Sequence, residues 1–449
     1  MSYLLSTVLA VVSLMLLSLP AVAQGTNPRG PSGGLFGATR PDVEGADRLN
    51  FTFDVAEGFE SDVPSEQGVA VVGGGLGTGG FSTLFGGSST YARRGRRLQL
   101  AASASTAFKY YQRIERLDPL SHGASIGLGL RLPKQGKFEI TQAAAYSPSY
   151  LYQLFPQVNA PELGALIPLN PDYQIDQRNS SSYSTRAAVN YGAQRGTQFS
   201  TFGEYTVTAY QNEAAREDAA AVAGLETRSI GTRLSRAITS RASFASEYRY
   251  RTGEFEFKGS SQEHEARIGV EYSPPLSASR RLTIRLNAAP AWLKFPAAAL
   301  ATVVTATTDQ YLFRLQGDGY VSYPFRRNWL AAAAYDRGVQ YLVGLPEPLL
   351  SDSVRAQLTG LISRRVDLSA SAAYFTAESG IPGSSQNLDT YTGTVKIRYA
   401  FTRSVAMYSE YLYYYYDQGQ SSLVPGLPSV FEQHGIRVGV ALFTTVLGR

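Results

Sequence analysis

The sequence predicts an all-β fold: a transmembrane, antiparallel, up-and-down β-barrel of about 18 strands, within a range of 16–20. Three observations predict it. Segments of roughly ten residues alternate apolar and polar side chains along most of the chain, as strands of membrane barrels do. The apolar side of these segments excludes charge. The connections between the segments alternate between short and long.

The first observation is a period of two residues. Leu282, Ile284 and Leu286 share one face of a segment, whereas Arg281 and Arg285 share the other. Successive side chains of a strand point to opposite faces, so this pattern predicts a strand with one apolar and one polar side. Eighteen such segments begin near Arg48, Gly79, Arg97, Ala124, Lys137, Ser182, Thr197, Arg228, Arg241, Glu263, Arg281, Asp309, Asn328, Ser353, Val366, Asn387, Ser404 and Glu432.

The second observation concerns charge on the two faces. From residue 182 onward the polar faces carry ten bases and eight acids, while the central apolar faces carry none. A base at the bilayer midplane costs about 2–4 kcal/mol, which explains the exclusion. We therefore expect the following side chains to line the lumen: Arg186, Arg233, Arg249, Arg267, Arg285, Arg314, Arg355, Lys396, Arg398, Arg437, Glu204, Glu247, Glu265, Glu271, Asp318, Asp336, Asp367 and Glu410.

These charges have two interpretations. Bases and acids could oppose one another across a water-filled pore and set its ion selectivity. The slight excess of bases would then give a mild preference for anions. Alternatively, the charges pair with one another inside a plugged barrel. Barrels of about 16–18 strands leave an aqueous channel, which favours the first interpretation.

The third observation is the length of the connections. They are long after odd-numbered segments, as in residues 149–181, and short after even-numbered ones, as in residues 93–96. Short periplasmic turns and long outer loops are typical of transmembrane barrels. An even number of strands also brings both ends of the barrel to the periplasmic side.

The N-terminus resembles an export signal. Residues 4–19 form an apolar run that is followed by small residues up to Ala23, a pattern typical of a secretory signal peptide cleaved before Gln24. The chain therefore divides into a signal peptide (1–23), a periplasmic linker (24–47) and the barrel (48–445). No other stretch reaches about 18 apolar residues, so strands must cross the membrane.

Tyrosines lie near the ends of the segments, where a ring can be buried while its hydroxyl stays hydrated. In the run from Tyr411 to Asp417, parity points Tyr414 and Tyr416 inward. They could stack on a sugar there, or the run could be a dense part of an aromatic girdle. The girdle is expected to include Tyr250, Tyr323, Tyr335, Tyr374, Tyr399, Tyr411 and Tyr413.

The sequence offers little for catalysis. It has no cysteine and three histidines, and no spacing places a nucleophile beside a base. Residues 75–80 match a dinucleotide-binding pattern, but strand-like residues rather than a helix follow them. We therefore expect no enzyme, no cofactor and no metal site. A net charge of +5 spread along the chain gives no reason to expect a nucleic-acid partner.

The short turns repeat a pattern. Residues 323–330 and 399–406 each join an apolar strand end, an arginine-containing turn and a strand that reaches tyrosine. In this the chain resembles the outer-membrane β-barrel porins of Gram-negative bacteria, some of which are linked to exopolysaccharide export. The resemblance covers residues 48–445. It implies residence in the cell outer membrane, contact with outer-membrane lipid and insertion by the barrel-insertion machinery.

The function implied is a porin-like channel for passive passage of small hydrophilic solutes. Two alternatives stay open: a dedicated conduit for exopolysaccharide export, and a closed barrel with a structural or adhesive role.

Overall fold

The computed structural model describes residues 35–36, 47–61, 80–111, 120–133, 135–147, 179–193, 196–211, 224–255, 259–277, 280–295, 309–325, 328–341, 348–379, 387–419 and 429–448. The expected signal peptide lies outside these residues, as does most of the expected linker. Within the described part of the chain, no helix has the length and apolarity needed to span a membrane.

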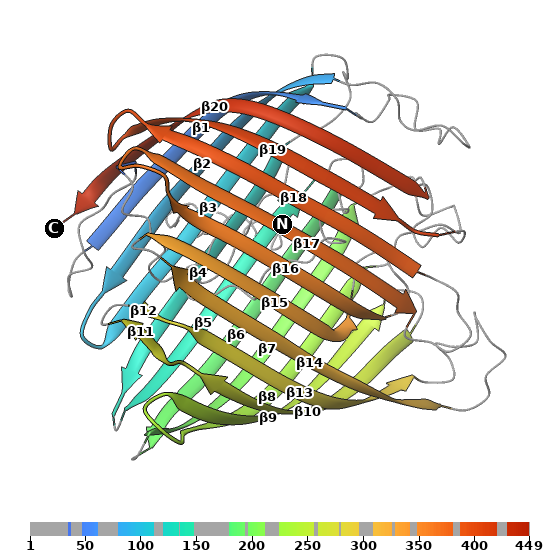
Figure 1. Ribbon diagram of the computed structural model, residues 1–449. Coiled ribbons are helices and arrows are strands. Elements are labelled where there is room, and N and C mark those ends of the chain that lie inside the picture. The colour runs from blue at the N-terminus through green and yellow to red at the C-terminus, as the bar shows by residue number, and fades with distance from the viewer. Residues whose placement is uncertain are drawn as a thin grey trace, which may run out of the picture.

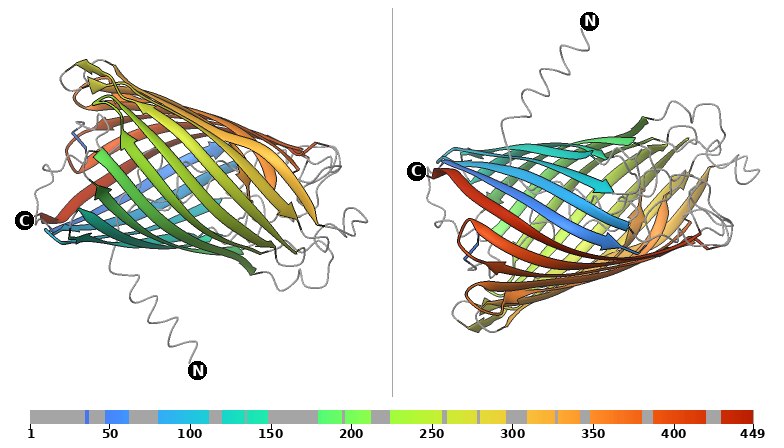
Figure 2. Two further views of the ribbon diagram at one scale, coloured as in Figure 1. Left: turned by 90° about the horizontal axis from the view of Figure 1, so that it is seen from below. Right: turned by 90° about the horizontal axis from the view of Figure 1, so that it is seen from above.

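The chain forms one closed sheet of 18 strands and a small two-stranded hairpin, β11–β12 (Figures 1 and 2). The strands of the closed sheet are β1 (Asp47–Glu60), β2 (Gly80–Arg94), β3 (Leu98–Tyr111), β4 (Leu120–Leu132), β5 (Gly136–Ser147), β6 (Asn179–Ala193), β7 (Thr197–Gln211), β8 (Leu225–Ala237), β9 (Ala242–Phe255), β10 (Gly259–Tyr272), β13 (Thr283–Phe295), β14 (Gln310–Phe325), β15 (Trp329–Gln340), β16 (Leu349–Leu361), β17 (Val366–Ser379), β18 (Asn387–Ala400), β19 (Val405–Asp417) and β20 (Val430–Gly448). The hairpin consists of β11 (Pro275–Ser277) and β12 (Arg280–Arg281).

Each strand of the closed sheet pairs antiparallel with its neighbours in the sequence, and β20 pairs with β1 to close the barrel. Closure leaves no free sheet edge, which a membrane-spanning sheet requires. The predicted fold class and strand number are confirmed. All eighteen predicted segments begin within four residues of an observed strand.

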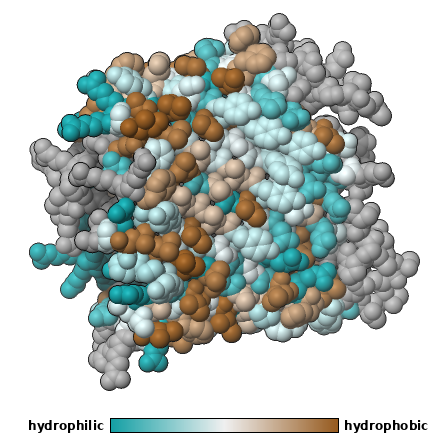
Figure 3. Space-filling view, in the orientation of Figure 1, coloured by the Kyte–Doolittle hydropathy of each residue, from teal (hydrophilic) through white to brown (hydrophobic). Residues whose placement is uncertain are grey.

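The two faces of the wall differ as the alternation predicted. On β20, for example, Ile436, Val438 and Val440 are exposed on the outside, whereas Ala441 is buried on the inside. The outer face carries a belt of apolar side chains (Figure 3). This belt is the surface that lipid can cover, because apolar area is favourably removed from water.

The connections follow the predicted alternation except around β10. Only residues 256–258 separate β9 from β10, where a longer connection was expected. The following turn covers residues 273–282 and contains the hairpin β11–β12, in which Pro275 pairs with Arg281. The rest of that end of the barrel consists of turns of three or four residues.

The two rims of the barrel carry opposite charge. The turn rim is the end of the barrel with the short connections, such as residues 95–97 and 362–365, where the chain also enters β1 and leaves β20. The loop rim is the opposite end, with the connections such as residues 61–79 and 418–429. Each rim includes its connections and the last two residues of every strand that reaches it. The described turn rim holds fourteen bases (Arg48, Arg93, Arg94, Arg96, Arg97, Arg131, Lys137, Arg236, Arg241, Arg280, Arg281, Arg364, Arg365 and Arg403) and three acids (Asp47, Glu271 and Asp367). The described loop rim holds six acids (Glu60, Glu226, Glu254, Asp309, Glu378 and Asp417) and one base, Lys294.

Candidate functional site

The candidate site is the inner face of the wall. By strand parity, all eighteen side chains predicted to line the lumen lie on the face opposite the exposed apolar residues. On β6, Val189 and Tyr191 are exposed on the outside, so Arg186 points inward. On β16, Val354 is exposed on the outside, so Arg355 points inward.

The densest group of charges spans β9 to β14. Both Arg249 and Arg267 donate to the carboxylate of Glu265, which is almost fully buried. Arg267 also contacts Asp318 at 2.7 Å, and Asn287 donates to the same carboxylate at 2.6 Å. Two bases and an amide thus neutralise and hydrogen-bond two acids, as buried charges require.

Further ion pairs join strands that are adjacent in the sheet. Arg233 lies 3.7 Å from Glu247, Arg285 3.1 Å from Glu271, and Arg398 2.9 Å from Asp367. Lys396 and Arg437 both contact Glu410, at 3.4 and 2.9 Å. In each case the partners lie side by side along the wall. The charges are therefore locally paired and do not form the separate opposed rings that one interpretation of the sequence required.

Three predicted bases have no ion pair among the described residues. Arg186 lies over the ring of Phe202, 5.7 Å from its centroid, and opposite Glu204 in the register. Arg314 donates to the carbonyl oxygen of Phe313. Arg355 lies diagonally across from Asp336 on β15, and its Nε has no hydrogen-bond partner.

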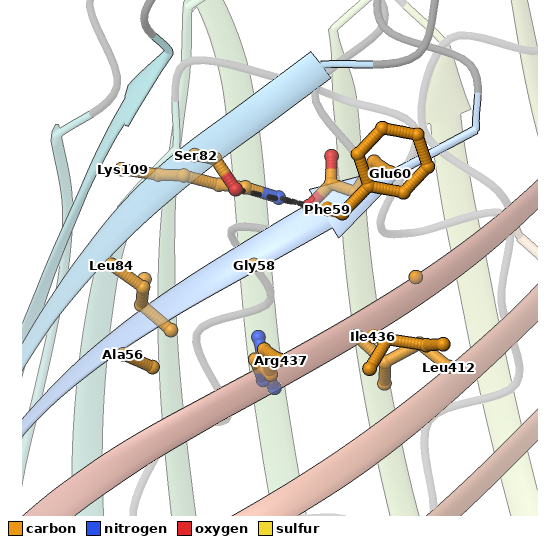
Figure 4. Close-up of a pocket in the computed structure, with 11 residues that line it drawn as sticks. Ala56, Gly58, Phe59, Glu60, Ser82, Leu84, Lys109, Leu412, Ile436 and Arg437 are labelled. Atoms are coloured by element: carbon orange, nitrogen blue, oxygen red, sulfur yellow. Dashed lines mark hydrogen bonds and ion pairs between the residues drawn. The ribbon is translucent and has the colours of Figure 1, made fainter.

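A buried ion pair near the loop rim was not predicted. Lys109 on β3 donates to Glu60 on β1, and both side chains are buried (Figure 4). Tyr111 and Gln433 donate to the other oxygen of the same carboxylate, at 3.3 and 3.1 Å. The charges predicted to line the lumen all follow residue 182 in the chain, so neither member of this pair is among them.

A second unpredicted group lies where β15 leaves the wall. The pairing of β14 with β15 stops at Gly317 and Arg337, although β14 continues to pair with β13 up to Gln310. In Figure 1 the outer end of β15 diverges from β14. Beyond this point, Val339 is buried together with Leu293 and Phe295, side chains of the inner face of β13. The outer end of β15 therefore bends into the lumen.

Tyr341 packs the bent end of β15 against β9 and β10. The guanidinium of Arg251 lies 4.3 Å from the centroid of the Tyr341 ring and donates to the carbonyl oxygen of Val339 at 2.7 Å. Arg251 also donates to Glu263, and Ser261 donates to the Tyr341 hydroxyl at 3.2 Å. Burial raises the pKa of that hydroxyl above its usual value. The hydroxyl oxygen accepts the hydrogen bond from Ser261 while the ring covers the Arg251 guanidinium.

The third unpredicted element is Phe36, which precedes the barrel in the sequence. Its ring packs against a cluster on the inner face that includes Ala56, Tyr408 and Ala441. Arg398 lies 4.9 Å from the centroid of the ring, and Phe443 lies 6.0 Å from it. Part of the segment interpreted as a periplasmic linker is therefore placed against the lumenal wall.

The unpredicted charges change the balance of the inner face. The predicted set has ten bases and eight acids, an excess of two. By strand parity Lys109, Arg251, Arg48, Arg94, Arg131 and Lys137 add six bases, and Asp54, Glu60, Glu139 and Glu263 add four acids, which gives sixteen bases and twelve acids among the described strand residues. The excess of positive charge on which a preference for anions would rest is thus four, and the added bases lie mostly toward the turn rim.

The inner face is also uneven around the barrel. Near mid-height on β3 to β5 it consists of small side chains, among them Ser103, Ser125, Thr141 and Ala143. The hydroxyls of Ser103 and Ser125 bond to each other at 2.6 Å. One part of the wall is therefore neutral and lined by small residues, and the charged groups occupy the remainder.

The two inward tyrosines of β19 are not available to stack on a sugar. Tyr414 and Tyr416 are buried, and both rings pack against Phe431, at 6.1 and 5.6 Å between centroids. Their neighbours Tyr413 and Tyr415 point outward. Tyr413 donates to Glu432 and lies 5.1 Å from the ring of His434.

The side chains predicted to form the girdle all lie on the outer face. Toward the turn rim, Tyr323 stacks on Phe325 and Tyr399 packs on Phe401. The other five lie at mid-height or nearer the loop rim. There, Tyr250 packs on His264, Tyr335 donates to Asp352, Tyr374 packs on Tyr391, and Tyr411 and Tyr413 contact His434.

The described residues contain no group of histidine and carboxylate side chains that could hold a metal ion. His122, His264 and His434 lie on the outer face, each beside a tyrosine ring. These contacts are those of interfacial aromatic residues.

A closed antiparallel sheet with an apolar outer face and a charged, hydrogen-bonded inner face defines a β-barrel of the outer-membrane type. No protein-family model matches the chain, and no curated protein does. Among solved structures it is similar to OpdQ of Pseudomonas aeruginosa, with a TM-score of 0.45 and 8% identity over 89% of this chain and 98% of that one.

Two further solved structures resemble it to a similar degree. OccAB4 of Acinetobacter baumannii gives a TM-score of 0.41 and 11% identity over 90% of this chain and 100% of that one. The ferric citrate transporter FecA gives 0.44 and 11% over 89% of this chain and 64% of its own. At these values the likeness is one of general architecture and carries no inference about a solute.

Proposed function

We propose that this chain is a passive channel in the outer membrane of a Gram-negative bacterium, through which small hydrophilic solutes diffuse. The observation that carries the proposal is the direction of the ion pairs. Most join neighbouring strands along the wall, as Arg233 and Glu247 do, and the pairs Arg267–Asp318 and Lys109–Glu60 skip a single strand, so these pairs satisfy the charges without bridging the lumen. A closed sheet of about 18 strands is wide enough to enclose water rather than a packed core.

The balance of charge supports a broad solute class. With sixteen bases and twelve acids among the described strand residues of the inner face, most charges compensate one another, and the wall offers polar contacts to hydrated solutes with a modest net attraction for anions. Three bases without an ion pair among the described residues, Arg186, Arg314 and Arg355, supply part of this preference. No described contact favours the exopolysaccharide conduit or the closed structural barrel.

The test is ion conductance of the purified protein in a planar bilayer, with the reversal potential recorded under a gradient of potassium chloride. We expect discrete conductance steps and a small reversal potential of the sign for anion preference. Replacing all three of these arginines with glutamine should move the reversal potential toward cations. Absence of conductance in correctly inserted protein would contradict the proposal and leave the closed barrel as the better account.

A further inference from the structure

The turn rim combines three properties that point to a partner. It holds fourteen bases against three acids in its described residues, and thirteen of the bases are arginine. Arg96, Arg97, Arg364 and Arg365 are exposed, and none of them forms an ion pair with a described residue. Exposed arginines such as these four, on a rim where bases far outnumber acids, are suited to bind anionic groups from outside the chain.

The arginines surround the barrel instead of forming a patch on one side. They lie in the turns after β2, β8, β10, β16 and β18, which are spread around the closed sheet. A single docked protein would contact only part of such a ring. The rim bases within strands face both ways: Arg93 and Arg236 lie on the outer face by parity with Phe85 and Leu234, and Arg48, Arg94, Arg131 and Lys137 lie on the inner face. The outward bases and the exposed turn arginines are the ones that lipid can reach.

The ring also lies next to the aromatic side chains that mark the membrane surface. Phe401 on the outer face is two residues from Arg403, and Trp329 packs beside Phe325 and pairs with Gly360, next to the turn that holds Arg364 and Arg365. Aromatic girdles lie at the depth of the lipid headgroups. In Figure 3, hydrophilic side chains border the apolar belt on the left of the view.

Arginine is the base that suits phosphate, because its planar guanidinium donates two parallel hydrogen bonds to phosphate oxygens. We propose that the turn rim is a basic collar that binds the phosphate groups of anionic phospholipids in the leaflet that surrounds it. The loop rim, with six described acids and one base, should show no such preference. The proposal requires membrane insertion but does not depend on the channel conducting.

The chain provides its own reporters for the test, because its only two tryptophans lie toward opposite ends of the barrel. Trp329 begins β15 at the turn rim, and Trp292 lies near the outer end of β13 and is half exposed. The variant Trp292→Phe leaves a reporter at the collar, and Trp329→Phe leaves one at the other leaflet. Each protein is reconstituted in phosphatidylcholine vesicles containing brominated phosphatidylglycerol or, for comparison, brominated phosphatidylcholine, and quenching of fluorescence is measured.

We expect brominated phosphatidylglycerol to quench the fluorescence of Trp329 more than its mole fraction in the vesicle predicts. Quenching of Trp292 should match the mole fraction. The double substitution Arg364→Gln, Arg365→Gln is made in the Trp292→Phe background. Each arginine near an anionic surface contributes about 1 kcal/mol, which corresponds to about fivefold in affinity. We therefore expect the affinity for phosphatidylglycerol, relative to phosphatidylcholine, to fall by about fivefold for each arginine removed. The matched control removes two lumenal bases, Arg314→Gln with Arg355→Gln, and should keep the preference. Salt at 1 M should abolish it, because screening then acts over about 3 Å.

Equal quenching of Trp329 by the two lipids, in protein whose β-sheet circular dichroism is intact, would overturn the proposal. So would a preference that survives removal of Arg364 and Arg365. The other class of partner is a soluble polyanion. It is tested by titrating dextran sulfate into protein reconstituted in vesicles of phosphatidylcholine alone. Binding of this soluble polyanion without any preference for phosphatidylglycerol would assign the collar to a soluble partner and reject the lipid. Conductance of the same preparations tests the channel separately.

Discussion

Lys109 on β3 and Glu60 on β1 form a buried ion pair that spans the intervening strand β2. The carboxylate accepts further hydrogen bonds from Tyr111 and Gln433, so the network ties β1, β3 and β20 together at the place where the barrel closes. A charge removed from water is stabilised only while its partner is present. The pair therefore holds the seam of the barrel.

Removing one partner should destabilise the barrel more than removing both. Lys109→Met leaves Glu60 buried without its counter-charge, and we expect a loss of about 3–5 kcal/mol in the free energy of unfolding. The double variant Lys109→Met, Glu60→Gln should recover part of the loss, since no charge is then stranded. Urea unfolding from lipid vesicles, followed by tryptophan fluorescence, measures both. Equal losses in the single and double variants would show that the two side chains act independently.

The bend at the outer end of β15 depends on Tyr341. Tyr341→Ala removes a ring packed on Arg251, and we expect a loss of about 3–5 kcal/mol, as for other large aromatic truncations. Tyr341→Phe keeps the ring and loses only the hydrogen bond from Ser261, which is worth about 0.5–1.5 kcal/mol. In a planar bilayer the alanine variant should also conduct more, because the end of β15 is no longer held in the lumen. Identical conductance in both variants would mean that the bend does not narrow the channel.

Phe36 should obstruct the lumen from the turn rim. Phe36→Ala removes apolar burial of about 1.5–3 kcal/mol and a cation–π contact with Arg398 of about 0.5–1 kcal/mol. We expect larger conductance steps from this variant. Phe53→Ala is the control, because Phe53 is half exposed on the outer face of β1. An equal rise in conductance in the Phe53→Ala control would contradict the conclusion that Phe36 obstructs the lumen.

Adjacent residues of one strand should respond differently to the same charge. On β5, Ile140 lies on the outer face and Thr141 on the inner face, both near mid-height. Ile140→Arg should cost about 2–4 kcal/mol, the value for a base on the lipid side near the midplane. Thr141→Arg should cost little stability and shift the reversal potential toward anions. Equal destabilisation by the two substitutions would contradict the assignment of faces on this strand.

The strands and their faces could be predicted from the sequence because they depend on local alternation. Each of the eighteen lumenal charges follows from the parity of its own strand, with no knowledge of its neighbours. Their pairing could not be predicted in this way, because it depends on the register between strands. Arg267, for instance, meets Asp318 only because β10, β13 and β14 are aligned as they are.

The missed residues share a physical reason. Tyr341 follows the end of a strand, and its place inside the lumen comes from contacts with β9 and β10, which are distant in the sequence. Phe36 precedes the first strand, and no periodic pattern marks it. The hairpin β11–β12 occupies a connection that was expected to be short, since Arg281 was assigned to the following strand. Such features arise from tertiary packing, so the alternation of apolar and polar residues along the chain does not predict them.

The most direct test of the account uses the fact that the chain has no cysteine. Ser184 and Val189 lie on the inner and outer faces of β6. A charged, membrane-impermeant methanethiosulfonate reagent is added to single channels of Ser184→Cys and Val189→Cys in a planar bilayer. An open lumen predicts a stepwise fall in current for the first variant and no change for the second. Modification that leaves the current through Ser184→Cys unchanged, or that lowers the current only in Val189→Cys, would contradict a water-filled channel lined by this face.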